Sequence, residues 1–136
     1  MKRHLTLHND VGEIPQLAAF IDETAEEAGI ETALAMSLNL AMEEAVVNVM
    51  NYAYPAGTVG TIDIDAEYTD GQLSFVISDS GTPFDPTKAD NPDITLAAED
   101  RAIGGLGIFL VRQIMDHVEY QHRDEKNILT LRKQIQ

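Results

Sequence analysis

A polar stripe runs along a predicted helix in the middle of the chain. In the segment from Glu44 to Asn51, steps of three and four residues place Glu44, Asn48 and Asn51 on one helix face. Its flanks are strongly apolar, and a partly buried Asn or Glu costs free energy unless it finds a partner. A hard cation would supply one, because Mg²⁺ binds oxygen ligands such as the carbonyl of Asn48. The alternative is the solvated side of an ordinary helix.

A second polar group follows a predicted strand, in the sequence Asp79-Ser80-Gly81-Thr82-Pro83-Phe84. These residue types are also the ones that turns prefer, so an ordinary turn is an equal alternative. A carboxylate at Asp79 could accept a hydrogen bond from the exocyclic amine of adenine. Gly81 would let the base approach the backbone closely. Taken alone, this segment is a weak indication of a nucleotide.

A third group, Gly104-Gly105-Leu106-Gly107, opens a predicted helix. Backbone N–H groups and the dipole at a helix start favour anions without needing lysine. A flexible hinge or close helix packing is the alternative. The segment is neither the P-loop, which needs Gly-Lys-Ser/Thr, nor the dinucleotide fingerprint, because it follows no strand directly and lacks the spacing of the third glycine.

Basic and metal-binding side chains are scarce around these groups. Arg101 is the only basic residue between Lys88 and Arg112, and it could reach a terminal phosphate, although such an arginine is more often a surface charge. The four histidines lie in predicted strands without cysteine or a fitting carboxylate spacing. We interpret them as structural or solvent-facing residues: His4, His8, His117 and His122.

Composition sets further bounds. With 136 residues and 44% hydrophobic content, the chain is expected to form one domain over residues 1–136. The net charge of −14 makes nucleic acid an unfavourable partner, and it means that a bound polyphosphate needs local donors and a cation. We find no cysteine, no leader and no apolar run of about 18 residues, so we expect no membrane span and a cytoplasmic location.

The elements that must position these groups follow from periodicity. Apolar residues at helical steps, a Gly29 stop and alternating residues predict this order: strand 3–8, helix 14–28, helix 32–54, strands 61–68 and 73–78, a long lid-like loop 82–103, a helix opening at 104, and strands 118–122 and 128–133. The summed order favours an α+β two-layer sandwich, with a mostly antiparallel sheet covered on one face by three helices.

Three local details of these elements can also be predicted. Asp10 and Glu13 have the spacing of a capping box at the first helix. Asp70-Gly71 predicts a type I′ hairpin turn. The last helix is predicted to turn four apolar residues inward, namely Leu106, Leu110, Ile114 and Met115.

The order and spacing of the three polar groups carry more information than any one of them. Glu44-x-x-x-Asn48, then Asp79-x-Gly81-x-Pro83-Phe84, then Gly105-x-Gly107 at a helix start resembles the GHKL ATPase superfamily. Within it, the chain is similar to the small single-domain branch, the anti-sigma-factor serine kinases. The similarity spans nearly the whole chain, and it implies the Bergerat-type ATP-binding fold.

The resemblance implies a role for each matching residue. Asn48 would ligate Mg²⁺ that bridges the phosphates of ATP, Asp79 would recognise adenine, and Gly81 would line the base pocket. Glu44 would be the general base that draws the proton from an attacking hydroxyl. The remaining residues predicted to contact the nucleotide are Asn51, Phe84, Arg101, Gly104, Gly105, Leu106 and Gly107.

The same resemblance implies partners. In these kinases the hydroxyl belongs to a serine of a STAS-type anti-anti-sigma protein, a sigma factor or similar regulator is bound and inhibited, and the chain commonly pairs as a homodimer. Two positions depart from the usual pattern. Ile103 stands where relatives tend to have the lid arginine, with Arg101 two residues earlier, and Asn127-Ile128-Leu129-Thr130 replaces a common Gly-Thr, with Asn127 or Thr130 as the substitute.

Other functions remain open at this point. The main alternative to a kinase is a non-catalytic switch, in which ATP orders the lid and the lid shapes a surface for a partner. A detached catalytic module of a histidine kinase is less favoured, because no dimerisation helix with a candidate phospho-histidine precedes the domain. The last alternative is an α+β domain that binds no nucleotide.

Overall fold

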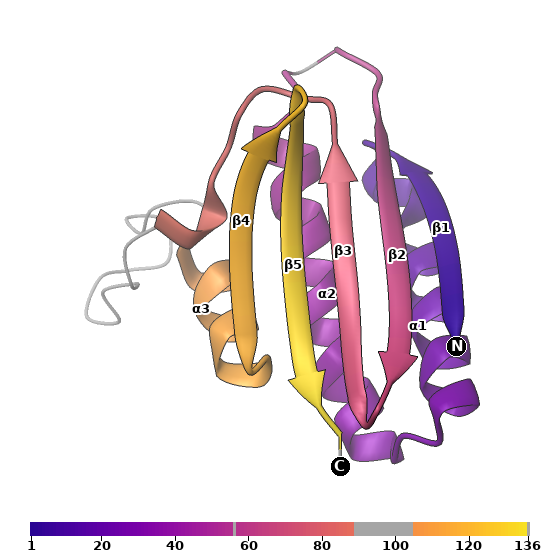
Figure 1. Ribbon diagram of the computed structural model, residues 1–136. Coiled ribbons are helices and arrows are strands. Elements are labelled where there is room, and N and C mark those ends of the chain that lie inside the picture. Colours follow the sequence, from indigo (N-terminus) through magenta and orange to yellow (C-terminus); the bar gives the residue numbers. More distant parts are fainter. Residues whose placement is uncertain (56, 89–104, 136) are drawn as a thin grey trace.

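A computed structural model describes residues 1–55, 57–88 and 105–135 of the chain. The described part is a five-stranded sheet with three α-helices on one face (Figure 1). This arrangement confirms the predicted α+β sandwich. The elements in chain order are β1 Lys2–His8, the 3-10 turn η1 Val11–Glu13, α1 Ile14–Ala28, α2 Thr32–Tyr52, β2 Thr61–Thr69, β3 Gln72–Asp79, the 3-10 turn η2 Pro86–Lys88, α3 Gly105–Ile114, β4 His117–Arg123 and β5 Lys126–Gln134.

The strands lie in the order β1-β2-β3-β5-β4, and each neighbouring pair is antiparallel. Because β5 inserts between β3 and β4, the end of β3 lies beside the start of β5. The register pairs Asp79 with Asn127 there. This order brings together two polar residues that lie far apart in the sequence.

Both hairpins turn through residues with positive φ. Asp70 (φ 55°) and Gly71 (φ 78°) join β2 to β3, which confirms the predicted type I′ turn. The β4–β5 hairpin turns through Asp124 (φ 54°) and Glu125 (φ 63°). Sequence patterns did not indicate this second turn type, because no glycine or asparagine marks it.

The start of α1 differs from the predicted capping box. Asp10 Oδ1 accepts a hydrogen bond from the backbone N–H of Gly12 at 2.9 Å and so caps η1. The backbone N–H of Glu13 donates to the Asp10 carbonyl, but the Glu13 side chain does not accept from the Asp10 N–H as a capping box requires. Its carboxylate accepts from the backbone N–H of His8 at 2.9 Å instead, because a short 3-10 turn precedes the α-helix. The predicted end of the helix is confirmed, with Gly29 in the left-handed conformation at φ 71°.

The core lies between the sheet and α2. Eight residues of α2 are buried, and Leu38, Met42 and Val46 are fully inaccessible to solvent. They pack against inward-facing residues of β2 and β3 such as Ile64 and Phe75. By length and composition alone α2 could span a membrane, so the expectation of no such apolar segment needs correction. In the described part of the chain its apolar residues form the core of the sandwich.

The inward face of α3 is rotated relative to the prediction. Ile108, Val111 and Met115 are the buried residues in and just after this helix, whereas Leu110 and Ile114 are only half-buried. The prediction was therefore wrong for Leu110, right for Met115, and right in part for Ile114, which is half-buried and packs against the core. The side chain of Leu106 lies outside what the structure describes. Ten helical residues contain fewer than three turns, which leaves the apolar stripe poorly defined in sequence.

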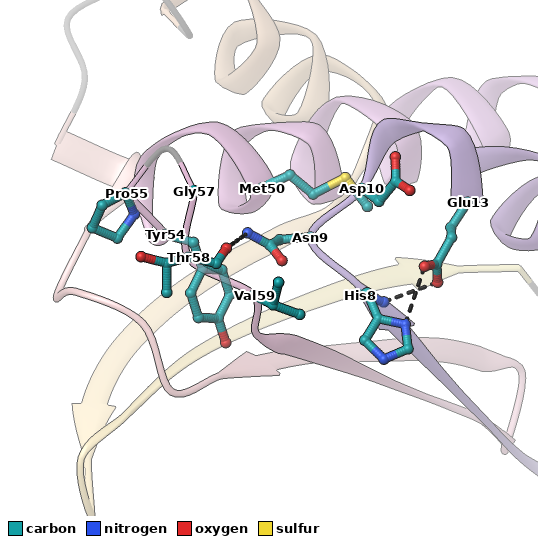
Figure 2. Close-up of a pocket in the computed structure, with 10 residues that line it drawn as sticks. All are labelled: His8, Asn9, Asp10, Glu13, Met50, Tyr54, Pro55, Gly57, Thr58 and Val59. Atoms are coloured by element: carbon teal, nitrogen blue, oxygen red, sulfur yellow. Dashed lines mark hydrogen bonds and ion pairs between the residues drawn. The ribbon is translucent and has the colours of Figure 1, made fainter.

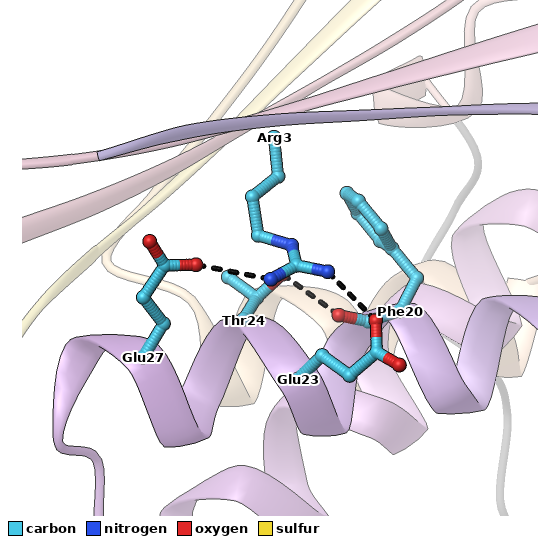
Figure 3. A network of polar contacts seen from close by, with 5 residues as sticks. All are labelled: Arg3, Phe20, Glu23, Thr24 and Glu27. Atoms are coloured by element: carbon cyan, nitrogen blue, oxygen red, sulfur yellow. Dashed lines mark hydrogen bonds and ion pairs between the residues drawn. The ribbon is translucent and has the colours of Figure 1, made fainter.

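An arginine ties the edge strand β1 to helix α1 (Figure 3). The Arg3 guanidinium donates to Glu23 Oε2 at 2.7 Å and to Glu27 Oε2 at 3.0 Å. It also lies 5.8 Å from the ring centroid of Phe20, in cation–π range. The two carboxylates lie one helical turn apart, so a single guanidinium contacts both. This cluster fixes α1 over the edge of the sheet.

We expect Arg3→Met to lower the free energy of unfolding by about 0.5 to 1.5 kcal/mol, because both ion pairs and the cation–π contact are lost while the aliphatic stem stays. Urea denaturation in low salt and in about 1 M salt measures the free energy of unfolding of both proteins. The difference between them should be smaller at high salt, because salt screens exposed charges. Lys2→Met, on the opposite face of the same strand, is the matched control and should have little effect. Equal stability of Arg3→Met and the unsubstituted protein in low salt would refute this account.

Candidate functional site

The loop after β3 is held against the C-terminal end of α2. The backbone N–H of Thr82 donates to the carbonyl of Ala53 at 2.6 Å. The N–H of Ser80 donates to the hydroxyl of Tyr54 at 3.2 Å, and that hydroxyl donates to the carbonyl of Thr61 at 2.7 Å. Carbonyls in the last turn of a helix have no partner within the helix, so a docked loop satisfies one of them. The helix and the strand end are thereby joined.

Gly81 sits at the closest approach of this loop to the helix. A Cβ at this position would lie 2.3 Å from the Ala53 carbonyl oxygen, a distance that no side chain tolerates. The docking therefore requires glycine. This packing role is a local reason for Gly81 that sequence analysis did not identify. Its expected contact with a base remains a prediction.

An aromatic pair closes the same junction. The rings of Tyr52 and Phe84 stack with centroids 5.1 Å apart and planes inclined by 27°. The hydroxyl oxygen of Tyr52 is completely shielded from solvent, and among the described residues it is the one completely shielded side-chain nitrogen or oxygen without a hydrogen-bond partner. Burial raises the pKa of the Tyr52 hydroxyl above its ordinary value. A buried hydroxyl without a partner is costly, so this one is available to a bound polar group.

The polar stripe of α2 is only partly as predicted. Asn48 is 6% exposed, Glu44 is half-buried, and Asn51 is exposed to solvent. The residue that faces the docked loop is Tyr52, four positions after Asn48, and not Asn51. Asn51 is therefore corrected in the predicted set. The loop packs against the residue four positions after Asn48 and not against the one three positions after it. The four-residue spacing from Asn48 to Tyr52 is the signal that could have found this residue.

Asn48 has the properties expected of a ligand-binding residue. Its side chain is more than nine-tenths buried, yet it forms no hydrogen bond within the described part of the chain. Its carbonyl oxygen is the kind of ligand that Mg²⁺ accepts. It lies one helical turn below Tyr52, which contacts the docked loop. The condition that would have excluded the predicted site, an Asn48 facing open water, is not met.

Asp79 is a buried carboxylate with one oxygen committed and one available. It is 4% exposed, and its Oδ1 accepts from the Gly81 N–H at 2.8 Å and from Asn127 Nδ2 at 2.9 Å. No hydrogen bond from the described residues reaches Oδ2. A carboxylate oxygen left in this state can accept from an amino group of a bound molecule. The predicted adenine-recognising residue therefore has a suitable local geometry.

The electrostatic environment of Asp79 favours a hydrogen bond from a bound amino group. Burial raises its pKa, while the hydrogen bonds from Asn127 and Gly81 and the positive field of His122 act in the opposite direction. Burial is the largest of these effects. The carboxylate is thus desolvated before any ligand arrives, and a hydrogen bond to it forms in a low-dielectric setting where it is strong.

Asn127 is one of the two residues predicted from the sequence to replace the Gly-Thr of similar proteins. It is 4% exposed and contacts Asp79 directly, whereas Thr130 points to the opposite face of β5 by strand alternation. Of the two substitutes considered from sequence, the structure therefore selects Asn127. Its partner Tyr120, which donates its hydroxyl hydrogen to Asn127 Oδ1, was not among the predicted site residues.

The glycine-rich segment is described only in part. Gly105, Leu106 and Gly107 form the first residues of α3, as predicted, but nothing is described of their side-chain surroundings. Gly104 and Arg101 lie outside the described residues. The helix itself packs along α2 and is tied to η2, where Arg112 donates to the carbonyl of Thr87. The N-terminus of α3 therefore belongs to the helix layer that contains Asn48.

A separate cavity lies on the other side of the α2 terminus (Figure 2). It has a volume of about 460 Å³, and none of the predicted site residues lines it. Asn9 donates from Nδ2 to the Thr58 carbonyl at 2.6 Å across it, and His8 pairs with Glu13 at 3.1 Å. Its polar groups are therefore already paired with each other. Tyr54 borders this cavity and also holds Ser80 of the docked loop.

The described residues contain no group of three or more His, Cys, Asp or Glu side chains that could hold a metal ion. Of the predicted site residues, Asn48 carries the oxygen expected to ligate Mg²⁺. Mg²⁺ is commonly bound by one or two side chains together with phosphate oxygens and waters. Asn48 therefore fits a Mg²⁺ that a nucleotide brings with it.

Comparisons with known proteins agree with this arrangement. Residues 7–133 match the family described as "Histidine kinase-like ATPase domain". A serine/threonine-protein kinase named BtrW from Bordetella bronchiseptica is 35% identical over 98 residues, which cover 72% of this chain and 69% of that protein. A serine-protein kinase named RsbW from Listeria monocytogenes is 30% identical over 109 residues, covering 77% and 69%.

A solved structure shows the same fold. The RsbU and RsbW domains of Rv1364c from Mycobacterium tuberculosis superpose with a TM-score of 0.71 at 17% identity. The match covers 99% of this chain but 32% of that one, so the similarity concerns one part of a larger protein. At this identity the likeness shows the fold and leaves the site to be argued from its own residues.

We expect Asp79→Asn to fold with stability equal to, or up to about 1 kcal/mol above, that of the unsubstituted protein at neutral pH. The asparagine oxygen can still accept from Gly81 and Asn127, and a buried charge disappears. The folded-state pKa of Asp79 is raised above 3.8, so ionised Asp79 costs stability above that pKa. The cost vanishes as pH falls through it, and the advantage of Asp79→Asn should shrink in acid. Denaturation at several pH values tests this, and a large loss of stability at neutral pH would contradict it.

Proposed function

This chain belongs to the histidine kinase-like ATPase domain family, and we propose that it is an ATP-dependent protein serine kinase that also binds and inhibits a transcription regulator. The observation that carries the proposal is Asn48, which is buried, forms no hydrogen bond with the described residues, and lies one helical turn before Tyr52, the residue that contacts the docked loop. Its relatives are named as serine and threonine protein kinases.

In the proposed site, Asp79 Oδ2 accepts the exocyclic amine of adenine, and Asn48 ligates the Mg²⁺ of the nucleotide. Bound Mg²⁺ would neutralise charge on the phosphates. The backbone N–H groups at the start of α3 offer donors for the same phosphates without adding a cationic side chain. Such local donors are what a chain with net charge −14 needs in order to hold a polyphosphate.

For the transfer step we propose Glu44 as general base. It lies one turn before Asn48 on α2 and is half-buried. The oxygen of a serine hydroxyl attacks the γ-phosphorus, its proton passes to the Glu44 carboxylate, and the bond to the ADP oxygen breaks. The serine is proposed to belong to a STAS-type protein, and the inhibited regulator is proposed to be a sigma factor. By analogy with similar proteins, we also propose a cytoplasmic location and a homodimer.

Nucleotide binding is tested by Asn48→Ala, with Asn51→Ala as the matched control. Both replace an asparagine of α2, but Asn48 is buried and Asn51 is exposed. We expect Asn48→Ala to weaken Mg-ADP binding by roughly 100-fold or more, since it removes the protein ligand proposed for the cation, whereas Asn51→Ala stays within about threefold. Isothermal calorimetry with and without Mg²⁺ measures both. Equal affinities of the two variants would remove the basis of the site.

Phosphoryl transfer is tested by Glu44→Gln, with the exposed neighbour Glu43→Gln as control. Each protein is incubated with γ-labelled ATP and a STAS-domain protein of the same organism. We expect label on the STAS serine with the unsubstituted protein and with Glu43→Gln, and a loss of about 10²- to 10⁴-fold with Glu44→Gln, the usual contribution of a general base.

Two results would change the conclusion. Binding of the STAS-domain protein in ATP without any label would support the non-catalytic switch in place of the kinase. Label at an unchanged rate with Glu44→Gln would retain the kinase and remove Glu44 as its base.

A further inference from the structure

The amide of Asn127 uses all of its hydrogen-bonding capacity at the junction described above. Its Nδ2 donates to Asp79 Oδ1 at 2.9 Å and to the Thr82 carbonyl at 2.9 Å. Its Oδ1 accepts from the Phe84 N–H at 3.1 Å and from the Tyr120 hydroxyl. Two donor hydrogens and two acceptor positions are thus all engaged. A buried amide in this state links β5, β4, the end of β3 and the docked loop.

The orientation of this amide is determined by its neighbours. If its oxygen and nitrogen were exchanged, the NH₂ group would face the N–H of Phe84 and the oxygen would face two acceptors, Asp79 and Thr82. The contacts to Phe84, Asp79 and Thr82 would then all be unfavourable, whereas the Tyr120 hydroxyl can either donate or accept. In the observed orientation Tyr120 donates to Oδ1 and adds a fourth hydrogen bond to the amide. Asn127 therefore always presents an N–H to Asp79.

The contacts of Asn127 determine which oxygen of Asp79 can meet a ligand. Its Oδ1 is held by Asn127 and Gly81, so Oδ2 alone remains to meet a bound base. An N–H donor also favours the ionised carboxylate against the effect of burial. A base with an amine opposite Oδ2 gains a hydrogen bond, whereas one without the amine leaves a buried carboxylate oxygen unpaired.

We propose that Asn127, oriented by the docked loop and supported by Tyr120, is the positioning residue that sets the base specificity of this site, by holding Asp79 with one oxygen directed at the exocyclic amine of adenine. This inference rests on the proposed nucleotide site. It goes further by assigning discrimination to an amide that does not contact the ligand. Since Asn127 acts through Asp79, its effect should appear as lost discrimination between bases and not only as weaker binding.

Asn127→Asp tests this with the least change of shape. The oxygen that accepts from Phe84 and Tyr120 is kept, and the donor facing Asp79 becomes a second acceptor. Two carboxylates at this separation cannot both ionise easily, so they share a proton at low pH and lose it as pH rises. At low pH the shared proton takes the place of the amide N–H as the hydrogen-bond donor to Asp79. At high pH this proton is lost.

Other ionisable groups act on the same junction. They are Asp79 on β3, Tyr120 and His122 on β4, Asp85 after the docked loop, and Tyr54 after α2. All of them are present in the unsubstituted protein as well. The difference between the two pH profiles therefore isolates the new carboxylate at position 127.

The measurement is calorimetric affinity for Mg-ADP and for the magnesium diphosphate of purine riboside, which lacks the amine, from about pH 5.5 to about pH 8.5. We expect the unsubstituted protein to prefer Mg-ADP by roughly 10- to 100-fold, the effect of one hydrogen bond to a charged group. That preference requires the ionised Asp79 carboxylate, so it should weaken only where acid protonates this group. Asn127→Asp should behave oppositely, keeping its preference at low pH and losing most of it as pH rises.

Tyr120→Phe and Thr130→Val complete the set. Tyr120→Phe leaves the amide less firmly oriented, so the preference should fall by about two- to fivefold without the reversed pH profile. Thr130→Val changes a buried residue of β5 on the opposite face and should leave the preference unchanged. Because Tyr120→Phe removes a single hydroxyl, it provides a reading even if Asn127→Asp does not fold.

The outcomes separate this inference from the proposed function. If the unsubstituted protein binds no Mg-ADP, or binds both diphosphates equally, the proposed nucleotide site itself fails. If it prefers Mg-ADP but Asn127→Asp weakens both ligands equally at every pH, Asn127 is only a structural residue and the inference is overturned. An unchanged preference in both Asn127→Asp and Tyr120→Phe overturns it as well.

Discussion

The docking of the Asp79 loop on the last turn of α2 is the contact on which the site depends. A helix ends with carbonyls that have no partner of their own, and a strand ends where its ladder stops. Here the Ala53 carbonyl and the Thr82 N–H satisfy each other, at a separation that only Gly81 permits. Asp79 and the buried part of α2 are thereby held in one rigid junction.

The same junction explains how an acidic protein can be suited to an anionic ligand. The described polar groups of the junction are mainly backbone N–H groups and side-chain amides, and not lysine or arginine side chains. Gly81 and Asn127 hold the charge of Asp79, and Asn48 offers a neutral oxygen to a cation. In the proposed function, such a site would recognise the nucleotide together with its Mg²⁺, because the cation offsets charge that the protein surface does not.

The comparison with the mycobacterial structure separates fold from site. A TM-score of 0.71 at 17% identity means that the layered architecture persists while most side chains change. In this chain the position of β5 beside β3, together with the register of the two strands, places residue 127 opposite residue 79. In this chain an amide stands there, with a tyrosine behind it. The fold thus provides the position, and the local sequence decides how the carboxylate is held.

Periodicity within segments was sufficient for most of the fold. The alternation in β2 and β3, the helical spacing in α1 and α2 and the Asp70-Gly71 turn all reflect hydrogen bonds between residues close in sequence, so sequence alone determined them. It also indicated Asn48 and Asp79, because buried polar residues in apolar segments are costly without a purpose. The inward face of α3 was mispredicted since a short helix contains too few turns to define its stripe.

The contacts that complete the site were decided by tertiary structure. The docked loop folds back across the end of α2 and packs against Tyr52, four residues after Asn48. Tyr52 therefore holds the place that the sequence predicted for Asn51. Asn127 and Tyr120 reach the site only through the strand order, across 48 residues in the case of Asn127 and Asp79. Local hydrogen bonding shapes each segment, but the partner of a buried polar group depends on which segments the core brings together, and no pattern within a segment contains that information.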